Sequence, residues 1–334
     1  MQKALLFGRN CNKLVAILRS KEGDRMDLLL AEQMLKDPAI TDLRKLHYKY
    51  PQADRNSFLS YLKTSCYREL SLPDFKGNPL VYLECIVNEQ AKNLSLSKDI
   101  QDRNPFALSL LEDEIASSLQ IEGIRVPREN IRKILQGSAP SGKEEEQIYG
   151  MKLGLDFIQD PEHSITEENI YQLYEVSIVP FLEEENRLLP GQHYRHAPVY
   201  IVGDKTEHSG LHPVKLAESM KTLVEFIQQE SELNDFFKAS VIHFYLAYLH
   251  PYFDGNGRMA RFLHLWYLLQ CGYTLDQLLP FSSRILTHKN DYYKAYSLIE
   301  KNAALSGVID VTPFLTYFTR RVYATPCNGS ATGK

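Results

Sequence analysis

Two strongly apolar stretches follow each other in this chain with only a short polar interval between them. The segment FFKASVIHFYLAYLH covers residues 236–250, and RMARFLHLWYLLQCG covers residues 258–272. Both have the length and composition of α-helices that are buried on most sides. Pro251 cannot continue the first helix, and Gly272 is a natural end for the second. The sequence therefore predicts two buried helices joined by a tight turn, against which the rest of the fold must pack.

The rest of the chain is also predicted to be mainly helical. A helix is expected to begin at Asn104, which precedes a proline, and to end at Gly123. Ser164 and Glu167 fit a capping box at the start of another helix. Residues 188–203, LLPGQHYRHAPVYIVG, alternate in character and predict a short exposed hairpin. The expected fold class is mainly α, with a helical core, a small β-hairpin and an N-terminal extension.

The pattern divides the chain into three parts. Residues 1–100 hold amphipathic runs with mostly helical spacing, although the first twenty residues also suit strands, and no chemistry can be assigned to this region. Whether it docks onto the core or forms a separate domain is left open. Residues 105–320 form the predicted core, and residues 321–334 are expected to be a flexible tail.

Composition excludes several classes of protein. The chain has 334 residues, of which 44% are hydrophobic and 24% charged, and a net charge of -4 without a long basic tract. We therefore expect a globular protein without a nucleic-acid partner. No apolar run approaches the roughly 20 residues that span a bilayer, so no membrane association is expected. Five scattered cysteines and a poor signal peptide favour a cytoplasmic setting. The oligomeric state stays open.

The turn between the two apolar helices reads LHPYFDGNGRMAR over residues 249–261. Its proline and glycines are ordinary turn chemistry, but a turn between apolar helices needs none of its charged and titratable residues. These are His250, Asp254, Arg258 and Arg261. Glycines at the start of a helix expose N–H groups that have no intrahelical partner, and they let a phosphate approach the backbone closely. The turn therefore has the makings of an anion site.

The charged residues complete this interpretation. Arg258 and Arg261 are three positions apart, so they project from one helix face and can hold a polyphosphate. Asp254 would face concentrated negative charge unless a divalent cation, with Mg²⁺ as the leading candidate, lay between them. His250 can take a proton near neutral pH. A polyphosphate, a metal and a base together predict transfer of a phosphate-linked group to a hydroxyl.

The segment HPYFDGNGRMAR resembles the core motif of Fic proteins, HPFx(D/E)GNGRxxR, and departs from it only in Tyr252, which replaces Phe. The resemblance extends from roughly residue 105 to residue 320 and leaves out the first hundred residues. It implies a Fic-type helical core with a hairpin flap. It also implies a protein AMP transferase that moves AMP from ATP to a Ser, Thr or Tyr hydroxyl of a target protein, which can include the chain itself.

The resemblance assigns roles to the loop residues. His250 would deprotonate the target hydroxyl, and Asp254 would bind the Mg²⁺ that bridges the nucleotide phosphates. The residues implied in phosphate binding are Gly255, Asn256, Gly257, Arg258 and Arg261.

Two flanking elements also resemble the family. The segment VYIVGDK, residues 199–205, looks like the flap that aligns a target by strand addition, although an ordinary edge hairpin is the alternative. Its implied nucleotide-side residues are Val202, Gly203, Asp204 and Lys205. Tyr292 would lie near the nucleotide base, and a core aromatic is an equal alternative. Glu300 stands where the family often has Asn or a small residue, so no role is transferred to it. We expect His243 to be a core histidine rather than a second metal ligand.

A segment upstream, SLQIEG at residues 118–123, fits the inhibitory signature (S/T)xxxE(G/N) of the family. Ser118 and Glu122 are four positions apart and share one helix face, and Gly123 ends the helix. An apolar stripe of Leu111, Ile115 and Leu119 would dock this helix on the core. The resemblance implies an inhibitory helix over residues 106–123, as in the class of Fic proteins whose inhibitory helix is N-terminal. The alternative is a common helix with an exposed Glu and a Gly at its end.

Other functions compete with AMP transfer. A Fic relative can remove AMP, with Glu122 positioning a water, or transfer another phosphate-linked group. A metal-dependent hydrolase would use His250 and Asp254, but the neighbouring arginines argue against it. An inactive binding module would be expected to lack His250 or the arginines.

Overall fold

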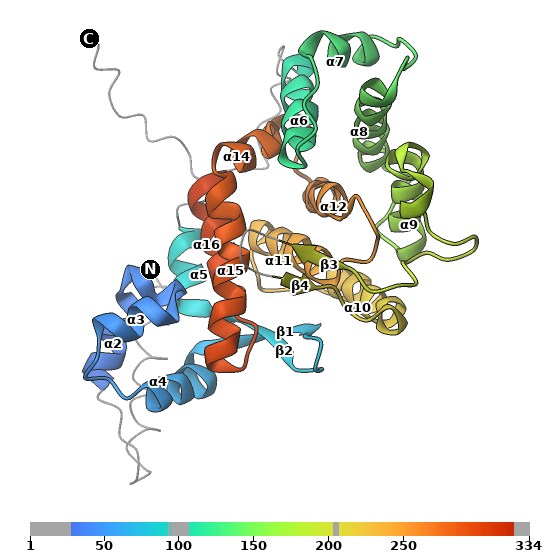
Figure 1. The fold of residues 1–334 in the computed structure, drawn as a ribbon. Helices are drawn as coiled ribbons and strands as arrows, with labels where there is room; N and C mark the ends of the chain where they lie inside the picture. The colour runs from blue at the N-terminus through green and yellow to red at the C-terminus, as the bar shows by residue number, and fades with distance from the viewer. Residues whose placement is uncertain (1–27, 93, 95–106, 203–206, 324–334) are drawn as a thin grey trace, which may run out of the picture.

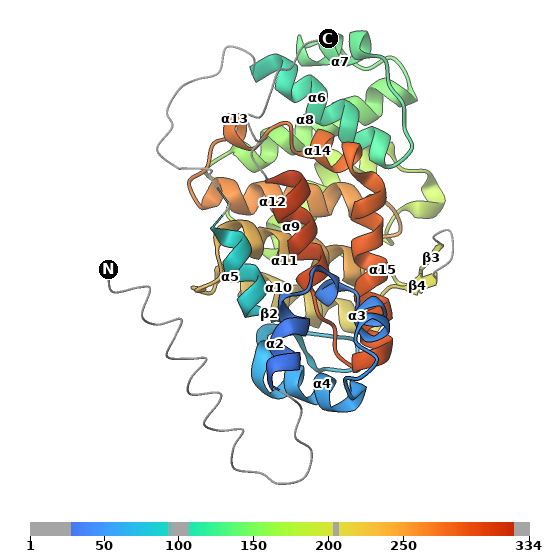
Figure 2. The ribbon, with the colours of Figure 1, turned by 90° about the vertical axis from the view of Figure 1, so that its left-hand side faces the viewer.

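The computed structural model describes residues 28–92, 94, 107–202 and 207–323, and Figures 1 and 2 show their arrangement. The expected helix start at Asn104, the first twenty residues, residues 324–334 of the expected tail, and Gly203, Asp204 and Lys205 lie outside the described residues. The predicted start of the tail at residue 321 is wrong, because Val322 and Tyr323 are packed in the core. The elements before the flap are α2 (Leu28–Lys36), α3 (Leu43–Lys49), α4 (Arg55–Tyr61), β1 (Tyr67–Pro73), β2 (Pro79–Leu83), α5 (Glu84–Ala91), α6 (Ala107–Ile121), α7 (Arg128–Leu135), α8 (Lys143–Gln159) and α9 (Glu167–Ser177). The later elements are β3 (Tyr200–Val202), β4 (Glu207–Ser209), α10 (Leu216–Gln228), α11 (Asp235–Leu249), α12 (Asn256–Gln270), α13 (Leu275–Leu278), α14 (Phe281–Thr287), α15 (Lys289–Ser306) and α16 (Thr312–Tyr317).

Helices α11 and α12 form the centre of the fold, as the two apolar stretches predict. Nearly every residue of both helices is buried, and the two helices pack against each other. Helix α10 lies against α11, and α8 lies against α12. The prediction of a mainly helical fold with a small hairpin is confirmed. Because α11 and α12 are enclosed, the loop between them is held by packing on both of its sides.

Helix α8 approaches its neighbours through two glycines. A Cβ at Gly154 would lie 2.3 Å from the Phe262 ring of α12, and one at Gly150 would lie 2.3 Å from the carbonyl oxygen of Ser177. Such distances exclude a side chain, so these glycines allow close contact of α8 with α12 and with the end of α9. The close contact positions the α8 side chains that reach the loop.

The described part of the first hundred residues contains a sheet as well as helices. Strands β1 and β2 pair antiparallel, with Tyr67 opposite Leu83, so the mostly helical spacing of residues 1–100 does not hold for residues 67–73 and 79–83. A short run rich in apolar residues reads alike in a strand and a helix. Here the run pairs with β1, and the Val81 amide also donates to the Ile309 carbonyl.

The same region rests on helix α15. Asn302, buried in α15, accepts a hydrogen bond from the Leu43 amide at 3.1 Å and donates one to the Thr41 carbonyl at 3.0 Å. Figure 2 shows α3 beside α15. A small core links α2, α3, α4 and β2; it consists of Met34, Ile40, Leu43, Leu46, Ala53, Phe58, Leu62 and Leu83.

Two local expectations have different outcomes. A flap hairpin is present, but it lies later in the chain than the predicted residues 188–203: β3 and β4 pair antiparallel with Tyr200 opposite Ser209, and residues 188–199 form no strand. The capping box at Ser164 is wrong. Thr166 is the N-cap of α9, and its hydroxyl accepts from the Asn169 amide at 3.1 Å. Ser164 contributes only its carbonyl, which accepts from the Asn169 side chain. Among the helices that the structure describes, none is both long and apolar enough to cross a membrane.

We predict that Gly150→Ala lowers the free energy of unfolding by about 1–2 kcal/mol. The added methyl group meets backbone, so overpacking of about 1–3 kcal/mol outweighs the helix-propensity gain of at most about 1 kcal/mol. Gly142→Ala is the matched control, because a Cβ there meets open space. Urea denaturation followed by circular dichroism measures both. Equal unfolding free energies of the two variants would show that α8 can shift without cost.

Candidate active site

The backbone of the 250–255 loop turns through two left-handed residues. His250 ends α11 with φ 53° and ψ 62°, and it is the one non-glycine residue with positive φ in the described part of the chain. Gly255, with φ 83°, immediately precedes α12. A left-handed conformation is disfavoured for a residue with a Cβ and usually marks a functional constraint. The loop thus has His250 at one end and the N-terminus of α12 at the other.

Asn256 holds the loop together from inside. Its Oδ1 accepts a hydrogen bond from the Tyr252 amide at 3.0 Å, and its Nδ2 donates to the Tyr252 carbonyl at 2.8 Å. The Tyr252 ring stacks on Tyr174 at 3.7 Å, and the Tyr174 hydroxyl donates to the Asp254 carbonyl at 3.3 Å. The Asn256 side chain is therefore engaged with the loop. A role for Asn256 in binding phosphate can use only its backbone N–H group.

The first turn of α12 forms a site for an anion, and a carboxylate lies against it. The leading N–H groups of a helix have no intrahelical acceptor, and the helix dipole adds positive charge there. A Cβ on Gly257 would lie 2.4 Å from Oε1 of Glu122. Glycine at this position therefore allows the Glu122 carboxylate to lie directly over the start of the helix.

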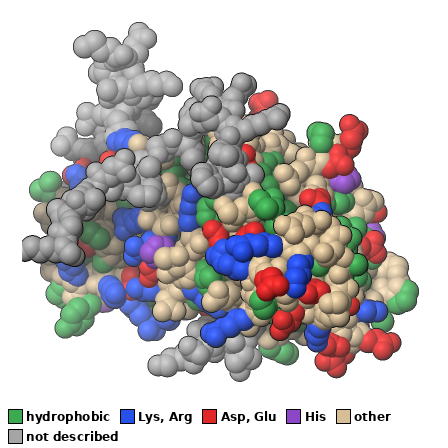
Figure 3. All heavy atoms as spheres, turned by 90° about the horizontal axis from the view of Figure 1, so that it is seen from above, with side chains coloured by type: hydrophobic (Ala, Val, Ile, Leu, Met, Phe, Trp, Pro, Cys, Tyr) green, Lys and Arg blue, Asp and Glu red, His purple; other side chains and the backbone are tan. Residues whose placement is uncertain are grey.

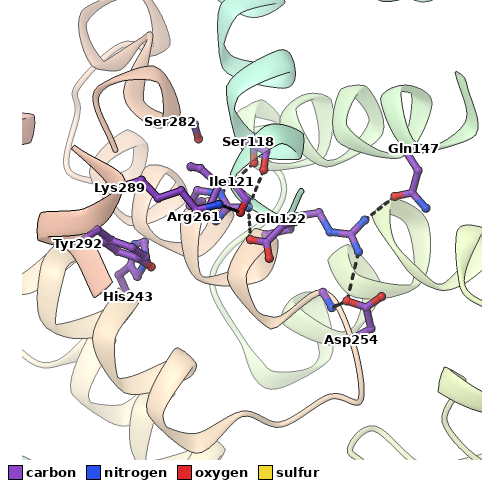
Figure 4. A network of polar contacts seen from close by, with 12 residues as sticks. Ser118, Ile121, Glu122, Gln147, His243, Asp254, Arg261, Ser282, Lys289 and Tyr292 are labelled. Carbon is purple, nitrogen blue, oxygen red and sulfur yellow. Dashed lines mark hydrogen bonds and ion pairs between the residues drawn. The ribbon is translucent and has the colours of Figure 1, made fainter. Parts of the chain in front are cut away.

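Arg261 forms an ion pair with the same carboxylate, that of Glu122. Its guanidinium is 2% exposed. Its Nε donates to the Ser118 hydroxyl at 2.9 Å, and its Nη2 donates to the Ser118 carbonyl at 3.1 Å and to Oε1 of Glu122 at 2.8 Å. Figure 4 shows Ser118 and Glu122 facing Arg261 from the end of α6. The upstream segment and the loop therefore meet at one buried cation. Gly123 follows with φ 85°, as expected for the end of this helix.

Arg258 points to the other side of the loop. Its Nη1 donates to Oε1 of Gln147 on α8 at 2.7 Å, and its Nη2 lies 3.6 Å from Oδ1 of Asp254. Burial lowers the pKa of Arg258, while the carboxylates of Asp254 and Glu122 partly offset this shift. The buried Nε has no hydrogen-bond partner among the described residues. Arg258 is thus a buried cation with donor capacity left for a ligand.

Asp254 is the most accessible acid of the loop. Its side chain is 53% exposed, and its Oδ1 accepts a hydrogen bond from the amide of Gly255. Within the part of the chain that the structure describes, no group of three His, Cys, Asp or Glu residues could enclose a metal ion. Asp254 is therefore the exposed carboxylate of the loop beside the anion site, and Glu122 is a second carboxylate at that site.

Several contacts dock helix α6 on the core. Ile115 and Leu119 are fully buried, and Leu111 is half-buried, so the predicted apolar stripe faces the core. Buried Glu114 accepts hydrogen bonds from the amide and hydroxyl of Ser282 on α14, and burial raises the pKa of Glu114. Lys289 donates to the Ile121 carbonyl at 2.6 Å and so caps the helix (Figure 4).

Helix α7 covers α6 on its outer side through ion pairs. Arg132 pairs with Glu112 at 2.9 Å, and Arg128 pairs with Asp113 at 2.5 Å. Figure 3 shows basic and acidic side chains interspersed among the described residues of the face seen from above, where α7 lies. Helix α6 is thus held from several directions, and Glu122, which follows its last residue, extends beyond these contacts.

Tyr292 and Tyr293 are neighbours on α15, but Tyr292 lies in the interior and Tyr293 lies at the surface. Tyr292 is buried; its hydroxyl lies 2.8 Å from Nε2 of His243 and 3.2 Å from the Tyr296 hydroxyl. Tyr293 is 47% exposed, and the Lys289 ammonium lies 5.7 Å from its ring centre. Burial lowers the pKa of His243, which is a core histidine as expected. Tyr292 occupies the position of a core aromatic, and its role beside a nucleotide base stays a prediction.

The flap residues are described only in part. Val202 is the last residue of β3, and its role in nucleotide binding also stays a prediction. Two residues that the sequence did not single out, Gln147 and Lys289, contact the site. Gln147 is 111 positions from Arg258, and no local pattern marks either residue. Only the packing of α8 and α15 brings them there.

The fold and the loop geometry together define a Fic-type site. Residues 164–268 match the Fic/DOC family. The protein adenylyltransferase Fic of Drosophila willistoni is 28% identical over 215 residues, which are 61% of this chain and 38% of that protein. The same-named protein of Drosophila grimshawi is 26% identical over 215 residues, 61% of this chain and 39% of that protein. The chain thus spans less than half the length of these curated relatives.

Solved structures agree on the fold. A Fic family protein from Desulfovibrio desulfuricans superposes with a TM-score of 0.57 at 20% identity, covering 72% of this chain and 70% of that one. A Fic domain containing signaling protein from Bacteroides thetaiotaomicron gives a TM-score of 0.55 at 21% identity, covering 71% and 92%. Residues 164–268 of this chain thus match the Fic/DOC family, and the chain shares the fold of these Fic structures.

We predict that Asn256→Ala lowers the free energy of unfolding by at least about 2 kcal/mol. The change leaves the buried N–H and C=O groups of Tyr252 without their partner, and each unsatisfied group costs about 1–3 kcal/mol. Asn169→Ala is the control, because that side chain makes a single exposed hydrogen bond. Chemical denaturation compares the two. A loss no larger than that of the control would mean that the loop is held mainly by its packing.

Proposed function

We propose that this chain is a protein adenylyltransferase that moves AMP from ATP to a Ser, Thr or Tyr hydroxyl of a protein, and that Glu122 restrains it. The observation that carries this proposal is the convergence of His250, the N-terminus of α12 and two buried arginines in one loop. The names of the curated relatives support the same activity.

The proposed reaction assigns a proton and a leaving group to this loop. His250 accepts the proton of the target hydroxyl, whose oxygen attacks the α-phosphorus of ATP. The bond to the bridging oxygen breaks, and pyrophosphate leaves with that electron pair. The first-turn N–H groups of α12 and the guanidinium of Arg258 stabilise the charge on the phosphates. That the α-phosphorus is attacked follows from the family alone.

A magnesium ion fits the donor set that Asp254 provides. Mg²⁺ is usually bound by one or two carboxylates together with substrate phosphates, not by a cage of protein ligands. Asp254 is exposed and beside the anion site, so it would hold the ion from the protein side. The ion, when bound, neutralises charge on the phosphates.

The flap would align the target. Strand β3 presents exposed Tyr200, and a target segment could add to this hairpin as a further strand. The residues Val202, Gly203, Asp204 and Lys205 are proposed on the nucleotide side, and Tyr292 near the base. In the pair, exposed Tyr293 is a second candidate for that base contact. A cytoplasmic location remains part of this proposal.

Glu122 would restrain the enzyme by occupying charge that ATP needs. Its carboxylate lies over the first turn of α12 and on Arg261, where an outer phosphate would otherwise bind. ATP that enters beside it would be held with its α-phosphate out of line. Displacement by about 1 Å can cost on the order of 10²-fold in rate.

Removal of AMP is a second candidate function. The Glu122 side chain is 33% exposed beside the loop, so it could orient a water toward a bound AMP group. Adding AMP-modified protein to the assays below, and measuring loss of AMP, distinguishes this reaction from transfer.

The activity itself is tested with His250→Ala. We expect intact-mass spectrometry to show AMP added to the protein or to lysate proteins in ATP and Mg²⁺. The variant should keep ATP binding but lose on the order of 10²–10⁴ in rate, because a general base acts in the transition state. Transfer by the variant at the rate of its parent would exclude His250 as the base.

Asp254→Ala should weaken nucleotide binding in Mg²⁺ and the Mg²⁺-dependent rate together. The reason is that a carboxylate contributes affinity only through the cation it shares with the phosphates. Calorimetric titration with ATP, with and without Mg²⁺, measures the effect. Glu168→Ala, an exposed acid on α9, is the control. An unchanged Mg²⁺ dependence in Asp254→Ala would show that Asp254 does not bind the metal ion.

Glu122→Gly should raise the rate of AMP transfer although it removes a charged group from the site. The reason is that Arg261 and the start of α12 become available to the outer phosphate. The fold should survive, since Glu114, Lys289 and the apolar stripe still dock α6, and the glycine costs about 1 kcal/mol.

Labelled ATP serves to compare wild type, Glu122→Gly and the double variant with His250→Ala. Restraint requires activation in the single variant and its loss in the double variant. Equal or lower activity in a folded single variant would instead leave water activation as the role of Glu122.

A further inference from the structure

A buried arginine outside the core motif holds the catalytic loop by its backbone. Arg195 is 1% exposed, and its guanidinium donates only to main-chain carbonyls among the described residues. These carbonyls belong to His250 at 2.7 Å, Ala197 at 2.8 Å, Leu249 at 3.5 Å and Leu211. Burial lowers the pKa of Arg195. A cation kept in the interior without a carboxylate partner is costly, so its position calls for a reason.

The four carbonyls come from two structures that must act together. Leu249 and His250 end helix α11, whereas Ala197 precedes strand β3 and Leu211 follows strand β4. Backbone hydrogen bonds reinforce the junction: the Arg195 amide donates to the Pro251 carbonyl at 2.9 Å, and the Leu211 amide donates to the Leu249 carbonyl at 3.1 Å. Arg195 therefore links both ends of the flap hairpin, by hydrogen bonds, to the start of the 250–255 loop.

The backbone of His250 needs such support. Its left-handed conformation costs of order 1–3 kcal/mol and persists only where the surroundings enforce it. The guanidinium of Arg195 donates a hydrogen bond to the carbonyl of His250. Gly210 completes the enclosure, because a Cβ there would lie 2.7 Å from Nη2 of Arg195 and 3.1 Å from Cβ of His250. Arg195 and His250 thus leave no room for a side chain at residue 210.

Simple helix capping is the competing explanation, and the chain contains an example of it. Lys238 is also a buried cation, and its ammonium donates to the carbonyls of Ile227 and Gln229 at the end of α10. It contacts neither His250 nor the flap. Arg195 differs because one of its carbonyl partners belongs to the proposed base itself and two, Ala197 and Leu211, flank the hairpin.

We propose that Arg195 is a positioning residue: its guanidinium sets the backbone, and so the imidazole direction, of His250, and fixes the flap relative to it. This inference rests on the proposed function for its rate prediction. Arg195 acts through His250 and through the base of the hairpin, at Ala197 and Leu211, whereas the proposed nucleotide-side residues of the flap begin only at Val202. Its loss should therefore reduce kcat and leave the KM for ATP unchanged.

The first experiment uses Arg195→Lys, which keeps the charge and removes the planar fork. In a Glu122→Gly parent, we expect kcat to fall by about 10- to 100-fold with an unchanged KM for ATP, because about 1 Å of misplacement has effects of this order. Lys238→Met in the same parent is the control and should lower the thermal midpoint without changing kcat. If Arg195→Lys lowers only the thermal midpoint, Arg195 is a structural cap and the proposal is wrong.

A second variant covers the case in which Arg195→Lys does not fold. Gly210→Ala keeps the arginine and presses a methyl group on both Arg195 and His250. We expect the same loss of kcat at unchanged KM, whereas Gly142→Ala should behave like the parent. A Gly210→Ala variant with the kcat of the parent would overturn the proposal.

A readout without turnover separates this inference from the proposed function. In protein labelled with ¹³C-histidine, the Cα and Cβ shifts of His250 report its left-handed backbone, and His250→Ala identifies the signal. The signal should move in Arg195→Lys and Gly210→Ala, and stay in Lys238→Met. Unchanged shifts in the first two variants refute the positioning role. Absence of AMP transfer in the parent would refute the proposed function while this measurement still decides the role of Arg195.

Discussion

The buried guanidinium of Arg261 is the charge around which the site is built. It is almost fully enclosed by the helical core, and a buried cation needs a partner because its water has been removed. In this structure the partners are Ser118 and Glu122, which lie 143 and 139 positions away in the chain. In the proposed reaction a nucleotide phosphate replaces the carboxylate. The cation is then paired with an anion in either state.

The proposed restraint depends on how α6 is attached. The helix is fixed by a buried apolar face, by Glu114 on α14 and by Lys289 at its end, whereas Glu122 follows the last helical residue. Its carboxylate could therefore turn away from Arg261 while the helix stays docked. Glycine at residue 257 makes the contact close, since any side chain there would collide with Glu122. Restraint and a preserved fold are thus compatible in one molecule.

The sequence predicted the parts of this site that are local. Helices α11 and α12, the loop between them, the flap hairpin and the helix that carries Ser118 and Glu122 all follow from periodicity and turn residues. Contacts between distant segments could not be predicted in this way. Gln147, Lys289 and Arg195 reach the site only through tertiary packing. The sequence also could not distinguish Ser164 from Thr166, because both residues suit a helix cap. In the first hundred residues, a short apolar run did not reveal whether it forms a strand or a helix.

Helix α15 connects two regions that are far apart in the chain. Lys289 at its beginning caps α6, and Asn302 near its other end is bonded to Thr41 and Leu43 of the N-terminal region. An uninterrupted helix of 18 residues is about 27 Å long at 1.5 Å per residue and behaves as a stiff rod. Helix α15 therefore connects the N-terminal region to helix α6, which Glu122 follows. A tilt of α15 imposed at Asn302 would displace Lys289, the lysine that caps α6.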